Sequence, residues 1–415
     1  MIFSLPDLVI GHRGTIVRKK LHNNIKAVYA LAFFHSFMVI VPVLVPFFNS
    51  KGLDLAEIFY LQALFAAVIV VLEAPSGYFA DLFGRRTALV LGSAIHGLGY
   101  LYLNFADSLL QLAVFEITVG ISMSLLSGAD LAILYDSQAA LKREENTEHS
   151  SGIAQLGFTK SCAEGLGALS GGVLALYSFD IMVLAQSAIA WACLAIALCL
   201  VEPPVHCEDH DRGKLRLAEV LRRLFLEDAL LRRVVVAIPL YSLATFHMAW
   251  LVQPYWEQQG LSLALFGILW FTQSLTVALG SKFGFYVERR LGAGGSLTLI
   301  GLLPVFGYFG VALAPPAVGI GLALLLFICR GLSQVILVNA LNRRVPSRMR
   351  ATANSLTSFM FRLAFIITGP AVGFLADSYG LGHALSLLGW ASVVLFVVVM
   401  MPLLQSVRGL LRAPA

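Results

Sequence analysis

Long, almost uninterrupted apolar runs constrain this chain more than any other feature of its sequence. A membrane-spanning helix needs about 20 apolar residues, and we find twelve such runs, at roughly 27–48, 55–79, 87–106, 109–139, 151–177, 181–201, 233–255, 261–286, 295–314, 317–341, 352–376 and 382–405. Because lipid offers the backbone no hydrogen-bond partner, each run must be helical. A strand barrel would show short segments of alternating polarity instead. The sequence therefore predicts an all-α integral membrane protein with twelve transmembrane helices.

The distribution of charge predicts how the chain is oriented. Only 13% of the residues are charged, against about 25% in soluble domains. The net charge is +5, and the basic residues lie mainly outside the apolar runs, which indicates membrane orientation rather than nucleic-acid binding. If the N-terminus lies inside, Lys51 is the only basic residue in the outer connections. We therefore predict a protein of the plasma (inner) membrane with both termini in the cytoplasm.

The longest connection divides the runs into two groups of six. We expect an N-terminal tail, a six-helix bundle, a linker, a second six-helix bundle and a C-terminal tail, at 1–26, 27–201, 202–232, 233–405 and 406–415. The linker ends in EVLRRLFLEDALLRRV, whose leucines recur at helical spacing between charges. This pattern fits an amphipathic helix on the inner membrane surface or, equally, a solvated linker helix.

Two pairs of segments, each about 200 residues apart, suggest that the halves are related. GYFADLFGRRTA (77–88) follows the second run as GFYVERRLGAGG (284–295) follows the eighth. GPAVGFLAD (369–377) similarly echoes SGGVLALYS (170–178). Ordered repetition of this kind is typical of secondary transporters built from two halves.

The segment 77–86 closely resembles the signature loop between helices 2 and 3 of the major facilitator superfamily, and the topology extends the resemblance over nearly the whole chain. The resemblance implies a gating motif that holds the two halves together on the cytoplasmic side, formed by Gly77, Asp81, Gly84, Arg85, Arg86 and Asp136. Its second-half counterpart comprises Gly284, Glu288, Arg289 and Arg290.

Physical chemistry supports a role for each residue of this loop. Gly77 would let helices approach closely, and Gly84 would allow a tight turn. Asp81 could accept hydrogen bonds from the first N–H groups of helix 11. Arg85 could pair with Asp136, whereas Arg86 is best explained as a positive anchor on the inner side.

Ionisable residues inside the spans are candidates for proton coupling. Each costs about 2.5–3.5 kcal/mol at a helix centre, so function must justify it. The acidic candidates, in order of preference, are Asp130, Glu116, Glu73 and Glu164. Asp130 ranks first because no cation lies within four residues on its helix, and on one continuous helix Glu116 would share a wall with it. Lys160 and Glu164, four residues apart, could neutralise each other.

The family resemblance implies a central cavity lined by helices 1, 4, 7 and 10. Aromatic and polar groups there suit an amphipathic organic substrate, and the candidates on these helices and on helix 11 are Phe34, His35, Tyr241, His247, Arg330, Gln334, Asn339 and Arg362. The two histidines could carry protons or could be hydrogen-bonded packing residues.

No enzyme motif is found. The sequence lacks a phosphate-binding GKS or GKT loop and a metal-ligand cluster, and its five cysteines predict no disulfide. We expect a monomeric transporter without cofactors, with a small-molecule substrate and protons as ligands. GALSGG (167–172) resembles a helix 5 segment of drug exporters, but alanine replaces its proline, and Glu116 stands where exporters often have arginine. Despite these two departures, we expect proton-coupled export of the drug-exporter type. Uptake of a small organic anion, bound by Arg330 and Arg362, is the alternative, and a receptor or lipid scramblase with this fold is a third.

Overall fold

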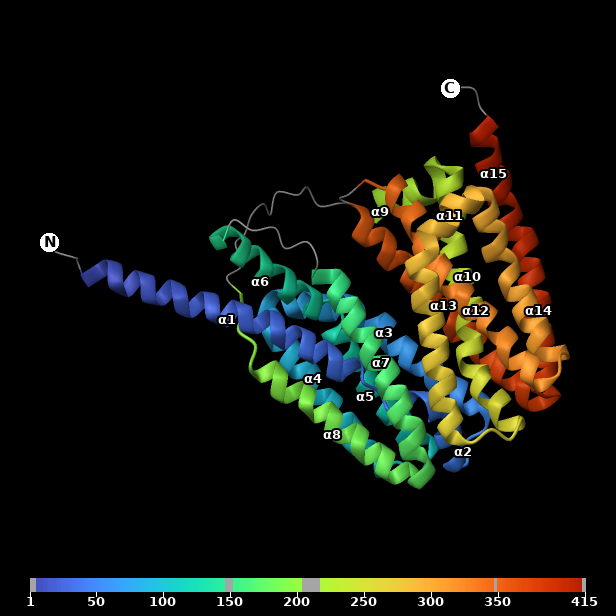
Figure 1. The fold of residues 1–415 in the computed structure, drawn as a ribbon, viewed down its shortest axis with the longest axis horizontal. Coiled ribbons are helices and arrows are strands. Elements are labelled where there is room, and N and C mark those ends of the chain that lie inside the picture. Colours follow the sequence, from blue (N-terminus) through green and yellow to red (C-terminus); the bar gives the residue numbers. More distant parts are fainter. Residues whose placement is uncertain (1–4, 146–151, 204–216, 347–348, 413–415) are drawn as a thin grey trace. The chain divides into compact units, whose positions relative to one another are not determined.

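The computed structural model describes residues 5–145, 152–203, 217–346 and 349–412, and these residues form helices and no strand (Figure 1). The α-helices in chain order are α1 (Leu5–Ser36), α2 (Leu44–Ser50), α3 (Leu55–Phe83), α4 (Arg85–Leu103), α5 (Leu109–Leu126), α6 (Ala129–Glu145), α7 (Gly152–Tyr177), α8 (Phe179–Leu198), α9 (Leu217–Arg222), α10 (Ala229–Gln258), α11 (Leu263–Leu313), α12 (Pro316–Arg344), α13 (Arg350–Tyr379), α14 (Leu381–Leu395) and α15 (Met401–Arg412). Short 3-10 or π turns lie at Val41–Val43, Arg223–Glu227 and Phe396–Met400.

Helices occupy most of every predicted apolar run. Nine helical stretches of the described chain are long and apolar enough to cross a membrane. The longest, α11, contains two predicted spans, separated by non-helical backbone at Gly292 with a φ of 69°. The predicted all-α membrane fold is therefore confirmed.

Two predicted spans are interrupted in the structure. The first run leaves helical geometry after Ser36 and resumes at Val41. The fourth run breaks between α5 and α6, where Gly128 adopts a φ of 84° that favours glycine. Periodicity could not show these breaks, because the apolar sequence continues on both sides of each break. Non-helical backbone at membrane depth is tolerated where it is buried in protein or lines a cavity.

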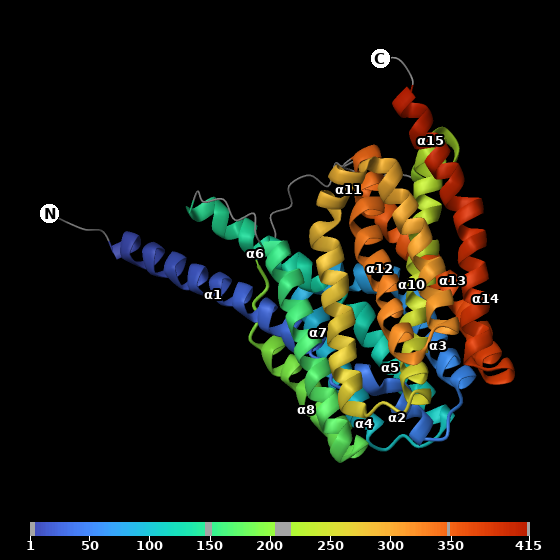
Figure 2. The ribbon, with the colours of Figure 1, turned by 45° about the vertical axis from the view of Figure 1, so that its right-hand side comes forward.

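The chain packs into two compact units. Unit 1 comprises Met1–Val41 and Val71–Glu208, and unit 2 comprises Pro42–Val70 and Asp209–Ala415. The helix α3 is thus shared: its first half packs in unit 2 and its second half in unit 1. Figure 2 shows α11 and α12 side by side within unit 2, in accord with their extensive contact. The predicted division into two six-helix bundles stays a prediction.

The end of the predicted linker packs on the core of unit 2. Val220 and Leu224 are almost fully buried among core residues of that unit. Arg222 and Arg223 both pair with Glu227, at 3.1 Å each. The part of the linker at 204–216 lies outside the described residues.

Candidate transport sites and gating motif

The signature segment forms a tight turn between α3 and α4 in unit 1. Gly84 has a φ of 90°, a conformation that favours glycine. A Cβ at this position would lie 3.1 Å from the carboxylate carbon of Glu202. A side chain on residue 84 would therefore strain the backbone and displace Glu202.

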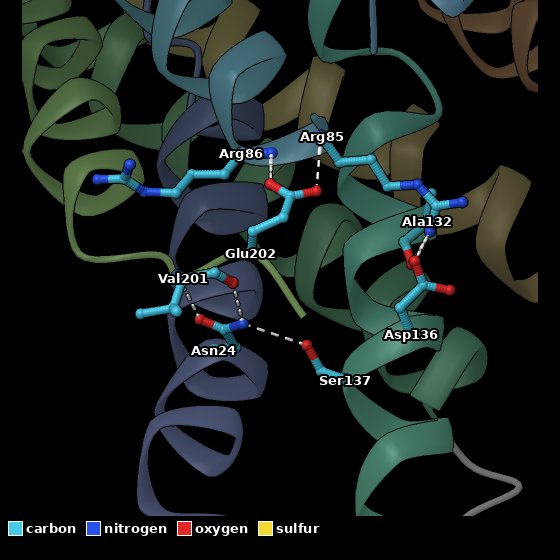
Figure 3. Close-up of polar contacts among 8 residues, drawn as sticks. All are labelled: Asn24, Arg85, Arg86, Ala132, Asp136, Ser137, Val201 and Glu202. Atoms are coloured by element: carbon cyan, nitrogen blue, oxygen red, sulfur yellow. Dashed lines mark hydrogen bonds and ion pairs between the residues drawn. The ribbon is translucent and has the colours of Figure 1, made fainter. Parts of the chain in front are cut away.

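Glu202 and Arg86 join the start of α4 to the end of α8. Figure 3 shows the carboxylate of Glu202 accepting hydrogen bonds from the backbone N–H groups of Arg85, at 2.9 Å, and Arg86, at 2.8 Å. The Arg86 side chain donates to the carbonyls of Leu200, at 2.6 Å, and Leu198, at 3.3 Å. An anion at a helix N-terminus and a cation at a C-terminus both complement the helix dipole. Arg86 therefore also binds the end of a helix, besides adding positive charge.

Arg85 connects the same turn to α6. Its guanidinium forms an ion pair with Asp136 and donates to the carbonyl of Ala132 at 3.0 Å (Figure 3). The two charged side chains are 28% and 30% exposed, so solvent weakens the ion pair itself. Its main effect is to orient α4 against α6. The gating role of these residues stays a prediction.

A buried amide completes this arrangement. Asn24 of α1 is 1% exposed and donates to the Val201 carbonyl at 2.6 Å and to the Ser137 hydroxyl at 3.3 Å. Its own side-chain oxygen accepts from the Val201 N–H at 2.9 Å. We call five of these residues the motif cluster: Asn24, Arg85, Arg86, Asp136 and Glu202. Sequence reasoning missed Asn24 and Glu202, because their partners lie more than a hundred residues away.

Besides Gly84, two residues of the motif lie outside this cluster. Asp81 is exposed, and no hydrogen bond joins it to another described residue of unit 1. Its predicted cap on helix 11 stays a prediction. No described atom lies within 4 Å of the place that a Cβ on Gly77 would take. No close helix approach is formed at Gly77 within unit 1, where that face of α3 is exposed, and the approach predicted for Gly77 stays a prediction.

The second-half counterpart lies within α11. A Cβ on Gly284 would lie 3.2 Å from the Val335 side chain, so this glycine permits close helix packing. The guanidinium carbon of Arg290 lies 5.4 Å from the ring centroid of Tyr286. Arg289 is exposed. The turn itself occurs at Gly292, which sequence reasoning missed. Its positive φ corresponds to that of Gly84.

A cavity of about 210 Å³ lies at both helix breaks of unit 1. It is lined by α1, α4, α5, α6 and α7, and its polar lining residues are His35, Ser36, Ser127, Asp130 and Lys160. Broken helices around polar groups at membrane depth are a feature of transporter binding sites. This cavity is therefore the leading candidate site in unit 1.

An ion pair forms one wall of the unit 1 cavity. The Lys160 Nζ lies 2.7 Å from Asp130 Oδ2, and the other carboxylate oxygen accepts from the Leu131 N–H at 2.7 Å. Local spacing suggests Glu164 as a partner of Lys160 and shows no cation within four residues of Asp130 on its own helix. The contact could not be predicted from this spacing, because Lys160 reaches Asp130 from another helix.

Glu116 and Asp130 do not share a wall of this cavity. Glu116 is 4% exposed within α5 and is not among the described residues that line the cavity. The predicted shared wall assumed 100° per residue along one continuous helix. The left-handed backbone at Gly128 interrupts that register, so the prediction is wrong. Glu73 is half-buried in the part of α3 that belongs to unit 1.

The helix break in α1 explains the glycines of the exporter-like segment. A Cβ on Gly171 would overlap the Val39 carbonyl oxygen, and one on Gly167 would lie 2.8 Å from the Met38 nitrogen. The Val39 N–H donates to Gln186 Oε1 at 2.7 Å. These glycines let α7 approach non-helical backbone, which is a packing reason independent of transport direction.

The aromatic candidates of helix 1 have different surroundings. His35 lines the unit 1 cavity, and its ring centroid lies 4.9 Å from that of the buried His96. Phe34 packs on the apolar core of unit 1. Sequence reasoning missed His96, whose neighbours are apolar in sequence.

Unit 2 holds a separate polar cavity of about 290 Å³ around Arg330 and Gln334. The Arg330 guanidinium carbon lies 5.7 Å from the Phe246 ring centroid, in cation–π geometry. The other polar lining residues are Ser242, Asn354, Thr357 and Ser358. A cation beside hydroxyl and amide groups suits a small polar or anionic ligand group.

The remaining candidates of unit 2 lie elsewhere. Asn339 lines a different cavity, of about 410 Å³, with Glu288. Nine residues separate Asn339 from Arg330, which places them on opposite helix faces, whereas Gln334 is four residues away on the same face. The prediction of one shared cavity is therefore wrong for Asn339.

The other three candidates of unit 2 are Tyr241, His247 and Arg362. Tyr241 is fully buried in the core of unit 2. His247 is 3% exposed, with its Nε2 3.2 Å from the Thr368 hydroxyl, as expected for a hydrogen-bonded packing residue. Arg362 is half-buried and does not line the Arg330 cavity.

Comparison with known proteins identifies the family. The sequence pattern of the Major Facilitator Superfamily matches residues 27–369, which is most of the chain. The chain belongs to this superfamily. Membership of the Major Facilitator Superfamily agrees with the prediction of a membrane transporter rather than an enzyme. No match is found among the curated proteins.

Solved structures share the Major Facilitator Superfamily fold. A mutant of the nucleoside transporter NupG is 12% identical, with a TM-score of 0.75 over 93% of this chain and 99% of that one. A bacterial homologue of the human lysosomal transporter Spinster is 16% identical, with a TM-score of 0.71 over 96% and 99%. A D-xylose–proton symporter is 16% identical, with a TM-score of 0.64 over 91% and 96%. At these identities the likeness shows the fold alone.

Proposed function

We propose that this superfamily member exports a small amphipathic molecule across the plasma membrane in exchange for protons. It works as a monomer by alternating access, with both termini in the cytoplasm. The observation that carries the proposal is the Asp130–Lys160 ion pair, which lines a cavity at the two helix breaks of unit 1.

The ion pair provides a means of coupling. A neighbouring ammonium group favours the charged form of a carboxylate, whereas burial without such a group favours the protonated form. Lys160 is on α7 and Asp130 is at the start of α6, so a shift between these helices would change their distance. An acidic residue within a membrane span is energetically costly, and such residues commonly have a function.

Uptake of a small organic anion is the second candidate. The Arg330 cavity favours it, because this cavity combines a cation with four hydroxyl or amide side chains from α10 and α13. A carboxylate on the substrate could accept hydrogen bonds from Arg330. Arg362 does not join this cavity, so the anion site would depend on Arg330.

Reconstituted vesicles with an imposed pH gradient separate the two candidates. The probes are ethidium, as an amphipathic molecule, and benzoate, as a small organic anion, with a pH-sensitive dye inside the vesicles. Export predicts that ethidium moves against its gradient while protons move the opposite way. Movement of benzoate together with protons, faster than in vesicles without the protein, would favour uptake instead. Proton-independent movement of both probes would contradict proton coupling.

A further inference from the structure

A second copy of the signature pattern occurs at the end of α13. Residues 373–377 read GFLAD and residues 77–81 read GYFAD, so both segments have glycine, an aromatic residue, an apolar residue and Ala-Asp. Each segment lies in the last turns of its helix, since α3 ends at Phe83 and α13 at Tyr379. The copy in α13 belongs neither to the three cavities described above nor to the motif cluster.

The aspartate of this second copy binds the start of α3. The Asp377 carboxylate accepts a hydrogen bond from the Ala56 N–H at 2.6 Å and one from the Leu55 N–H at 3.3 Å. Leu55 and Ala56 are the first two residues of α3. Their N–H groups have no partner within the helix, and a carboxylate there also complements the helix dipole.

The glycine of the second copy brings the two helices into direct contact. A Cβ on Gly373 would lie 2.8 Å from the Ala56 Cα and 2.9 Å from the Leu55 carbonyl oxygen. One turn earlier, a Cβ on Gly369 would lie 3.3 Å from the Phe59 ring. Glycine and aspartate thus act together: the glycine allows the approach, and the aspartate binds the helix end.

The start of α3 does not need Asp377 to form. Asp54 and Glu57 already make a capping box, with the Glu57 N–H 2.8 Å from Asp54 Oδ1 and the Asp54 N–H 3.1 Å from a Glu57 carboxylate oxygen. Asp377 adds a third carboxylate beside these two, which repel it. Its contribution is therefore to hold one helix to another, and mutual repulsion and exposure to water make the contact easy to release.

The helix α3 is held at its two ends by different units. Its residues up to Val70 pack in unit 2, and those from Val71 pack in unit 1. A rigid helix cannot follow both units when they move apart. We propose that residues 373–377 form a releasable latch on the first half of α3, and that α3 must leave Asp377 to move with unit 1. This inference rests on the alternating access of the proposed function.

Distances between spin labels test the latch. Labels are attached to cysteines introduced at Tyr60 of α3 and Tyr379 of α13, which are 58% and 65% exposed, with the native cysteines replaced by alanine. In Asp377→Ala we expect the ratio of long to short distances to rise about three- to tenfold, with a smaller rise in Asp377→Asn, because asparagine retains one acceptor. Gly373→Val should act like Asp377→Ala.

The matched control is Asp54→Asn. Asparagine caps a helix about as well as aspartate, and Asp54 binds its own helix, so the distances should stay as in the parent. Parent-like distances in both Asp377→Ala and Gly373→Val would overturn the latch.

A second measurement needs no variant. Hydrogen exchange of residues 54–58 in the unmodified protein should show protected Leu55 and Ala56 amides, and exchange at the rate of an open chain would overturn the latch. Neither readout uses substrate or a pH gradient. Failure of the latch would therefore leave coupling through Asp130 untouched, and failure of coupling would leave these distances unchanged.

Discussion

Lys160 and Asp130 form an ion pair between α7 and α6, with 2.7 Å between Nζ and Oδ2. The two side chains are 42% and 16% exposed, and both line the cavity at the helix breaks of unit 1. A structural ion pair and a coupling site have the same geometry, so only a functional measurement distinguishes them.

The first prediction tests this pair by substitution. Asp130→Asn should abolish uphill transport driven by a pH gradient while sparing downhill exchange, because the proton acceptor is lost. Lys160→Gln should also impair uphill transport, and the double variant should be no worse than Asp130→Asn, since the two residues act as one unit. Uphill flux and counterflow are measured in the same vesicles.

The control for this prediction is Asp180→Asn. Asp180 is an exposed acid in the first turn of α8 in the same unit. Its substitution should leave uphill flux at the level of the parent. Full uphill transport by Asp130→Asn would remove Asp130 from the mechanism, and Glu116 would become the next candidate.

The second prediction concerns the cap on α4. Glu202→Ala removes both side-chain acceptors at the Arg85 and Arg86 N–H groups and should cost about 1 kcal/mol of stability. Glu202→Gln retains acceptor oxygen and should lose less. Thermal unfolding in detergent measures the difference. Equal melting temperatures for Glu202→Ala and the parent would show that the cap contributes nothing.

The third prediction concerns the packing of α7 against the broken α1. Gly171→Ala would place a Cβ on the Val39 carbonyl oxygen, so we expect destabilisation by about 1–3 kcal/mol or more. Gly157→Ala is the matched control on the same helix, because no described atom lies within 4 Å of its Cβ position. The yield of monodisperse protein and its melting temperature compare the two. A Gly171→Ala protein as stable as Gly157→Ala would contradict the close approach.

The fourth prediction concerns orientation. A reporter fused after Ala415 should be active in the cytoplasm, and a tag inserted between Pro315 and Pro316 should be accessible from outside. The reason is the near absence of basic residues from the predicted outer connections. Protease protection of both sites in right-side-out vesicles gives the answer. A C-terminus on the outside would overturn the predicted count of twelve spans.

The sequence by itself determined where the helices lie and which family the chain resembles. Apolar runs of about 20 residues require helices wherever they occur, because the cost of an unpaired backbone group in lipid does not depend on the rest of the fold. Geometry between residues close in sequence is also predictable, because it too does not depend on the rest of the fold. The turn at Gly84 and the shared face of Arg330 and Gln334 follow from positions only a few residues apart.

Only the tertiary structure decided which distant groups meet. Lys160 has an acid four residues away, yet its ion pair with Asp130 crosses between helices. Glu202 caps α4 from 116 residues away, and α1 and α5 break inside apolar runs. Such contacts depend on which helix faces pack together, and side-chain periodicity shows which face is apolar but not which neighbour covers it. The partner of a buried charge is therefore decided by packing and not by local sequence.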